Sequence, residues 1–201
     1  MLNRLVADWV YGGFLAGLLL LLITPILARE WPQALLATFL CLPAYMVHQY
    51  EEHDDDRFSA FVNKRFGKGR EIISLLEVFL INVPGVWGVI AVSFWLAASL
   101  NPGFGLIAAY LLLLNAVIHI VWAAILRAYN PGLVTGVVFF IPLGGYCVAA
   151  IQQSGFGTAW MHITGAIVAV GIHAAIAVPV LFAARAGAKQ IQAHTPSSRT
   201  T

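Results

Sequence analysis

The stretch Phe104–Ala128, FGLIAAYLLLLNAVIHIVWAAILRA, decides the fold class of this chain. Asn-Pro-Gly turn signals bound it on both sides, at 101–103 and at 130–132. An α-helix needs about 20 apolar residues to cross the hydrocarbon core of a bilayer, and this run exceeds that length. Because every backbone amide in hydrocarbon must be paired within the segment, the stretch predicts a transmembrane helix.

The rest of the chain repeats this pattern. It is 60% hydrophobic and 10% charged, whereas a soluble domain carries about a quarter charged residues. We expect six transmembrane helices, at Trp9–Ala28, Gln33–Glu52, Glu71–Leu100, Phe104–Ala128, Leu133–Gln152 and Trp160–Ala184. The predicted fold is therefore an all-α polytopic membrane bundle, with a six-helix transmembrane domain over residues 1–186 and a polar, disordered cytoplasmic tail over residues 187–201.

Positive charge predicts the orientation, because Lys and Arg are retained on the cytoplasmic side. Of the 11 Lys and Arg residues, all but Arg29 fall on one side of the six-span arrangement. We therefore expect an integral protein of the bacterial inner membrane with both termini in the cytoplasm. The basic residues lie in short loops, which indicates no nucleic-acid partner. Residues 57–69 mix apolar and basic side chains and predict either an amphipathic helix on the inner leaflet or a solvated loop.

Ionisable side chains inside membrane helices are costly, so each needs a partner or a function. Six fall in the predicted helices: His48, Glu51, Glu52, Glu77, His119 and His173. At 1.5 Å rise per residue, Glu77, His119 and His173 lie roughly 10, 13 and 16 Å from the cytoplasmic ends of their helices. Four helices thus carry ionisable groups at similar depths, which predicts one shared site in the cytoplasmic half of the bundle.

The types of these side chains suit a transition metal. Glu51 and Glu52 follow His48 by three and four residues, so the three share one helix face, and Asn115 lies four residues before His119. Imidazoles and carboxylates bind iron or zinc, and six ligands can serve one ion or two. We expect as metal ligands His48, Glu51, Glu52, Glu77, His119 and His173. We expect as catalytic residues Glu52, Glu77 and Asn115, the last as an outer partner or weak ligand.

Packing explains other polar residues. A single His or Asn in a membrane helix commonly makes an interhelical hydrogen bond. Asn82 can mend the kink at Pro84, and residues 53–56, His-Asp-Asp-Asp, are typical of an interfacial acidic turn. We expect His162, at the opposite membrane face, and His194, in the tail, to be solvated.

With these residues in view, the chain resembles a family of small membrane proteins named for its His-x-x-Glu-Glu motif, here His48, Glu51 and Glu52. The resemblance covers most of the chain and extends to Asn115 with His119, to Tyr129–Gly132 with Thr135, and to His173. It implies positions and not a reaction, because the family has uncharacterised function and suspected metal or acid/base chemistry. It leaves open whether Asn82, Tyr129 and Thr135 contribute to the site.

Several functions fit these residues. The first is a metal-dependent membrane enzyme acting on a lipophilic substrate, and the share of carboxylates favours a di-iron oxidoreductase. A zinc-dependent hydrolase fits too, since three histidines and a water satisfy zinc. The alternatives are a metal-free acid/base isomerase or cyclase and a proton- or metal-coupled transporter. The transporter is disfavoured because no inverted repeat is evident. The sequence determines neither the metal, the substrate nor the oligomeric state.

Overall fold

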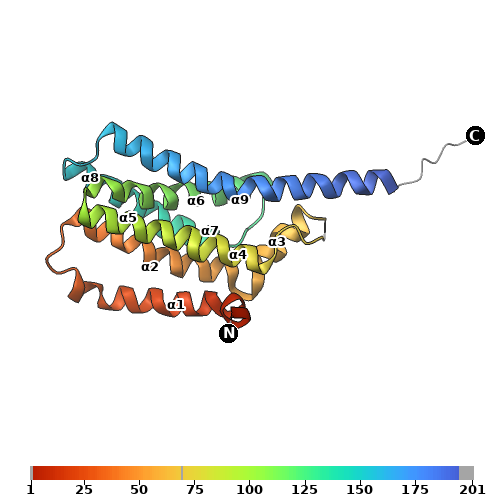
Figure 1. Ribbon diagram of the computed structural model, residues 1–201, viewed down its shortest axis with the longest axis horizontal. Coiled ribbons are helices and arrows are strands. Elements are labelled where there is room, and N and C mark those ends of the chain that lie inside the picture. The colour runs from red at the N-terminus through yellow and green to blue at the C-terminus, as the bar shows by residue number, and fades with distance from the viewer. Residues whose placement is uncertain (1, 69, 195–201) are drawn as a thin grey trace, which may run out of the picture.

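The structure is a computed structural model that describes residues 2–68 and 70–194 (Figure 1). The regular structure within those ranges is helical, without strands, which confirms the all-α prediction. The first hairpin is α1 (Leu2–Leu27) and α2 (Gln33–His53), followed by η1 (Asp54–Asp56) and α3 (Arg57–Arg65). The rest of the chain forms α4 (Leu75–Leu80), η2 (Ile81–Trp87), α5 (Gly88–Ser99), η3 (Pro102–Phe104), α6 (Gly105–Leu126), α7 (Leu133–Thr135), η4 (Gly136–Phe140), α8 (Ile141–Gln153) and α9 (Ala159–His194).

Two long continuous helical segments, called rods below, each consist of three consecutive elements: α4, η2 and α5 over 75–99, and α7, η4 and α8 over 133–153. In the first, π-helical η2 joins α4 to α5 around Pro84, whose missing N–H interrupts the α-helical ladder. In the second, π-helical η4 joins α7 to α8, with Pro142 at the start of α8. Wide π turns of this kind are frequent at functional sites, and both rods lie beside the polar residues described below.

Five helical segments of the described chain are long and apolar enough to cross a membrane: Asn3–Leu27, Leu75–Ser99, Pro102–Leu126, Leu133–Gln153 and Ala159–Arg185. The predicted second span, α2, is not among them, so the count of six stays a prediction. The polar C-terminal residues of α2 lower its mean hydropathy. It nevertheless lies within the bundle, against α1, α5, α6 and α8.

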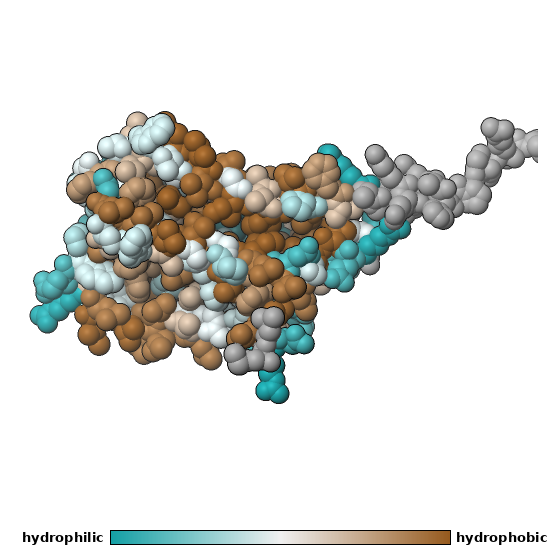
Figure 2. Space-filling model, in the orientation of Figure 1, coloured by the Kyte–Doolittle hydropathy of each residue, from teal (hydrophilic) through white to brown (hydrophobic). Residues whose placement is uncertain are grey.

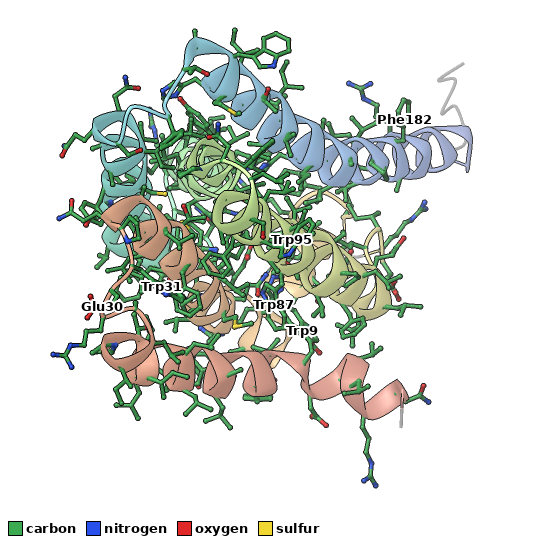
Figure 3. All side chains as sticks on the ribbon, turned by 60° about the vertical axis from the view of Figure 1, so that its left-hand side comes forward. Trp9, Glu30, Trp31, Trp87, Trp95 and Phe182 are labelled. Carbon is green, nitrogen blue, oxygen red and sulfur yellow. The ribbon has the colours of Figure 1, made fainter. Side chains whose placement is uncertain are left out.

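The outer surface is largely apolar, as expected for a protein surrounded by hydrocarbon. Figure 2 shows apolar side chains over most of the visible flank, with hydrophilic groups gathered toward the ends of the helices. Large apolar side chains are strongly exposed there, including Leu22 at 76% and Ile26 at 79%. In Figure 3, Phe182 of α9 points away from the bundle, whereas Trp9 and Trp87 turn toward each other inside it. These observations support a protein whose surroundings are lipid.

The core lies where α2, α6 and α8 meet. Many of its buried residues are small, among them Ala37, Ala108 and Ala109. Small side chains let membrane helices approach closely. Cys41 and Cys147 are free, buried thiols in this core. The tight packing fixes α2 against α6, the two helices that carry the candidate ligands.

Several boundaries differ from the sequence-based expectation: α1 begins at Leu2 instead of Trp9, and α2 ends at His53 instead of Glu52. The third span begins at Leu75 instead of Glu71, because Ser74 caps it. The segment after α2 contains a helix, α3, and not a plain loop. Its predicted position on the inner leaflet stays a prediction. Helix α9 continues to His194, so residues 187–194 are helical. The remainder of the predicted tail, 195–201, lies outside the described residues.

Candidate metal centre

Three buried side chains from two helices meet in the interior. His48 and Glu52 lie one turn apart on α2, and His119 faces them from α6; their relative exposures are 0%, 6% and 5%. His48 Nε2 is 3.4 Å from Glu52 Oε2, and His119 Nε2 is 3.6 Å from Glu52 Oε1. One ligand atom from each residue lies within 4.8 Å of the other two. These three residues could therefore hold one metal ion.

The hydrogen-bond partner of His48 determines which ring nitrogen carries its proton. Thr135 has a single hydroxyl hydrogen, and it donates this hydrogen to the Glu51 carboxylate. The Thr135 oxygen, 2.8 Å from His48 Nδ1, must then accept a hydrogen bond from His48. The proton of the neutral ring is thus on Nδ1, and the lone pair of Nε2 faces Glu52.

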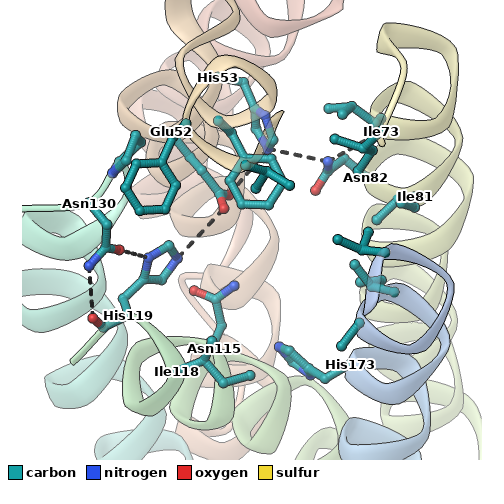
Figure 4. A pocket seen from close by; sticks show the side chains of 18 of the residues that line it. Glu52, His53, Ile73, Ile81, Asn82, Asn115, Ile118, His119, Asn130 and His173 are labelled. Atoms are coloured by element: carbon teal, nitrogen blue, oxygen red, sulfur yellow. Dashed lines mark hydrogen bonds and ion pairs between the residues drawn. The ribbon is translucent and has the colours of Figure 1, made fainter. Parts of the chain in front are cut away.

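His119 has the same arrangement with a different partner. The Asn130 amide nitrogen donates to the His119 carbonyl oxygen at 3.0 Å, which turns the Asn130 carbonyl oxygen toward the ring. That oxygen lies 2.6 Å from His119 Nδ1 and can only accept. The Nε2 atom of His119 therefore also faces the Glu52 carboxylate (Figure 4).

The arrangement of these atoms suits a metal ion. With both rings neutral, two imidazole nitrogens and a carboxylate face one another with no hydrogen to share, and His48 Nε2 is buried without a hydrogen-bond partner. Ligands bound about 2.1 Å from a tetrahedral ion stand about 3.4 Å from one another. The observed separations of 3.4 and 3.6 Å are close to that value. Outer groups that fix the protonated nitrogen are typical of metal-bound histidines.

The turn after α6 completes the enclosure. Gly132 has φ +92° and packs against both rings: a Cβ there would lie 2.7 Å from His119 Cε1 and 2.9 Å from His48 Cε1. The position therefore needs glycine twice, for its left-handed backbone and for the space that the imidazoles occupy. The Asn-Pro-Gly turn thus supplies both the Asn130 acceptor and a close backbone wall.

A family model described as "Protein of unknown function with HXXEE motif" matches residues 39–147, more than half of the 201-residue chain. The chain belongs to this family. The match confirms the resemblance drawn from the motif residues. No curated protein and no solved structure matches the chain.

The HXXEE motif divides into two roles in the structure. Its first and last residues, His48 and Glu52, belong with His119 to the group that could hold a metal ion, called the metal group below. Its middle carboxylate, Glu51, instead accepts hydrogen bonds from the backbone N–H groups of Val134 and Thr135, at 3.1 and 2.7 Å. Those are orphan donors of the rod that begins at Leu133, so Glu51 caps that rod and complements its dipole. The structure does not bring Glu51, a predicted ligand, into the metal group.

Tyr129 supports the same cap. Its hydroxyl donates to Glu51 Oε1 at 2.8 Å. Burial and the neighbouring carboxylate together raise the pKa of Tyr129 to about 12, so the phenol remains a donor at neutral pH. Tyr129 and Thr135, whose roles the sequence left open, therefore act on Glu51, and Thr135 also acts on His48.

Glu77 lies apart from the cluster. It is exposed in the first turn of α4, where its carboxylate accepts from the Ser74 backbone N–H at 2.7 Å and the Ser74 hydroxyl accepts from the Glu77 N–H. This reciprocal pair is a capping box, which orients the carboxylate toward the helix start. The predicted ligand and catalytic role of Glu77 assumed that the helix began earlier and placed the residue deeper.

Asn115 and His173 face the neighbouring cavity. His173 donates from Nδ1 to its own helix at Ala169 O, 2.8 Å away, and is not part of the metal group. Asn115 Oδ1 is buried with no hydrogen-bond partner. Figure 4 shows both side chains directed into the cavity beside His119.

The cavity itself is mainly apolar and has a volume of about 210 Å³. Glu52, His53, Asn82, Asn115, His119 and His173 are among its polar lining residues. The apolar lining comes from α3, α4, α6 and α9, including Phe58, Phe61, Trp122, Ile176 and Leu181. The apolar face of α3 thus covers one side of the space next to the candidate ligands.

Sequence reasoning misplaced two other histidines. His53 was expected in an interfacial acidic turn, but α2 runs one residue further than predicted and buries it, with Nε2 3.2 Å from Glu52 Oε2. The turn begins only at Asp54, which pairs with Arg57. His162, expected to be solvated, joins Tyr110 on α6 to Gln152 on α8. The side chain of His194 lies outside the described part of the structure.

Proposed function

We propose that this HXXEE protein is a membrane enzyme in which His48, Glu52 and His119 hold one metal ion beside a cavity for a lipophilic substrate. The observation that carries the proposal is the orientation of the two rings. Thr135 and Asn130 accept from Nδ1 of His48 and His119, which turns both Nε2 atoms toward the Glu52 carboxylate. A metal ion bound by both Nε2 atoms and the carboxylate would satisfy all three groups, and one ligand atom from each residue lies within 4.8 Å of the other two.

One ion is favoured over two. Dinuclear iron sites in helical bundles use several carboxylates from facing helices. Here Glu51 and Glu77 are engaged as helix caps, which leaves Glu52 as the only carboxylate in the group. Two histidines and one carboxylate form the ligand set of mononuclear non-haem iron(II) enzymes and of many zinc hydrolases. Such an ion supplies redox or Lewis-acid chemistry according to its identity.

The other residues bind and shield the substrate. The apolar lining of α3 and α9 can accommodate a hydrocarbon chain and exclude water from the ion. Asn115 Oδ1 has an unused acceptor lone pair, and His173 keeps Nε2 free because its Nδ1 proton goes to Ala169 O. Both can accept a hydrogen bond from the polar end of a substrate and orient it toward His119.

Metal content measured in purified protein tests this proposal. Protein purified in detergent without chelator should contain about one equivalent of a transition metal by mass spectrometry. His48→Ala, His119→Ala and Glu52→Gln should each lose most of it, because one of few bonds to the ion disappears. His162→Ala removes the contacts of a half-buried histidine elsewhere and serves as the matched control, with full metal content. A metal-free parent, or full retention in all three site variants, would refute the proposal and favour acid/base chemistry at Glu52.

A further inference from the structure

The cavity beside the metal group opens to the outside of the bundle along α9. Among the described residues that line it, Ala177 and Leu181 are exposed and the others are buried or half-buried. The two lie one helical turn apart, and Leu181 is 48% exposed. The side chain of Ala177 is a single methyl group, too short to line the cavity with one end and reach the outside with another. The wall is therefore open beside these two residues, at a place called the α9 opening below.

The α9 opening faces the hydrocarbon region. It belongs to a segment long and apolar enough to cross a membrane, which ends at Arg185. Ala177 and Leu181 lie about 12 and 6 Å before Arg185 along the helix. Their neighbour Phe182 is 64% exposed and points away from the bundle (Figure 3). Lipid chains surround this stretch of a spanning helix, so a molecule that enters here comes from the bilayer.

The metal group lies at a similar depth. Helices α6 and α9 run in the same direction, because one further span, Leu133–Gln153, separates them. His119 lies about 10 Å before Leu126, where the span of α6 ends. A molecule that enters beside Ala177 therefore reaches the metal group by moving in the plane of the membrane.

The lining changes in character between the two places. Next to the metal group it is polar, with Glu52, His119 and Asn115. Next to the opening it is apolar, with Ile176 and Val180 of α9 and with aromatic side chains of α3. A ligand that has one polar end and one hydrocarbon chain matches this order.

The volume of about 210 Å³ limits what can enter. A cavity of about 150 Å³ holds one benzene molecule. The space beside the metal group therefore accepts a small polar end and the first carbons of one chain, and it is too small for the headgroup and two chains of a phospholipid. The rest of a longer chain can remain in the bilayer, reached through the α9 opening.

The polar groups in the wall favour an uncharged end that donates a hydrogen bond. His173 lies one turn before Ala177 and points into the cavity (Figure 4). Its Nδ1 donates to Ala169 O, which leaves Nε2 as an acceptor. The described lining contains neither Lys nor Arg, and Glu52 is itself a carboxylate. A hydroxyl group can donate to His173 and needs no counter-charge, whereas a phosphate or carboxylate finds none among these side chains.

We propose that the substrate is a single-chain lipid alcohol that enters sideways from the bilayer through the α9 opening. Its hydroxyl group is held at His173, and its chain lies along the apolar lining of α9 and α3. The inference rests on the proposed function and names the substrate class of that site.

Labelling with a photoactivatable alcohol tests the route of entry. The probe is hexadecanol with a diazirine in its chain, in phosphatidylcholine vesicles, and mass spectrometry locates the label. The parent should be labelled at Val62, Ile73 and Val78, which line the cavity and are buried from lipid outside the bundle. Ala177→Trp fills the opening and should remove most of this internal label. Ala175→Trp, on an exposed part of α9 outside the lining, is the matched control and should be labelled like the parent.

A second blocking variant and the position of the label decide the outcome. Leu181→Trp closes the same opening from the next turn and should act like Ala177→Trp. Internal labelling that is equal in both blocking variants and in Ala175→Trp would overturn the route, and so would a parent labelled only on its outer surface.

Competition with unlabelled compounds tests the hydroxyl group. Hexadecanol should displace the probe from the cavity. Its methyl ether, which has no hydrogen to donate, should compete about 2-fold to 10-fold less well, the usual effect of one lost hydrogen bond. His173→Phe should remove this difference. Equal competition by alcohol and ether in the parent, or better competition by palmitate, would overturn the assignment of an alcohol.

Metal content separates this inference from the one beneath it. Ala177→Trp should retain the metal of the parent, because Ala177 is not in the metal group. If the parent holds metal and its cavity is not labelled, the lipid alcohol is wrong and the metal centre stands. If the cavity is labelled through the opening and the parent holds no metal, the proposed metal enzyme fails and the cavity is a lipid-binding site.

Discussion

At the scale of single residues, the Thr135 hydroxyl contacts two members of the HXXEE motif, His48 and Glu51. Thr135 donates to Glu51 and accepts from His48. Thr135→Val has nearly the same shape but no acceptor for the His48 proton, so the ring can change tautomer or turn. We expect metal affinity to fall about 10-fold to 100-fold, while Thr135→Ser retains it. Chelator competition with Co²⁺ measures both, and equal affinities for Val and Ser would show that the hydroxyl does not orient His48.

Gly132 gives a second test at the same scale. Gly132→Ala adds a methyl group that would meet both imidazoles within 3 Å, at a residue with φ +92°. The rings must move, so we expect loss of bound metal together with lower stability. Gly145→Ala is the matched control, because a Cβ there meets nothing within 4 Å. Retention of metal by Gly132→Ala, measured by mass spectrometry on folded protein, would show that the turn does not enclose the site.

At the scale of helices, caps explain why two predicted ligands are not in the metal group. Glu51 caps the rod that begins at Leu133, and Glu77 closes the capping box of α4. Glu51→Ala and Glu77→Ala should each lower stability by about 0.5–2 kcal/mol, the usual effect of losing a helix cap. Neither should lower metal content on folded protein. Unfolding in denaturing detergent and elemental analysis measure the two effects, and loss of metal in either variant would restore that glutamate as a ligand.

The errors of sequence reasoning arise at the same helix ends. Hydropathy predicted the long helices, and helical spacing placed His48 and Glu52 on one face. A helix end shifted by one residue, however, hid His53, and one shifted by four residues placed Glu77 too deep. Asn130 orients the His119 ring from a turn and Thr135 orients the His48 ring from the three-residue helix α7, where no periodicity signals a partner. Contacts of this kind depend on the tertiary arrangement of α6, α7 and α2.

At the scale of the whole molecule, the topology depends on whether α2 crosses the membrane, because this decides whether the number of crossings is odd or even. Five segments qualify as spans, and an odd number of crossings would put the two termini on opposite sides of the membrane. If α2 also crosses, both termini lie on the side that carries nearly all the Lys and Arg residues, as the positive-inside rule requires. Its close packing against α1, α5, α6 and α8 favours a crossing. The metal group at its C-terminal end would then lie toward the cytoplasm.

Cysteine labelling in intact cells tests this topology. Both native cysteines are buried, so we expect little labelling of the parent protein. Glu30 lies in the turn between α1 and α2, and Lys64 lies on α3 after α2; both are exposed. If α2 crosses, a membrane-impermeant thiol reagent should label Glu30→Cys from outside, and Lys64→Cys only after the membrane is permeabilised. If α2 does not cross, both positions lie on the same side and label together. Lys64→Cys therefore discriminates between the two topologies, with Glu30→Cys reporting that the reagent reached the outer face. Labelling of Lys64→Cys in intact cells would leave five crossings and move the metal group to the outer side.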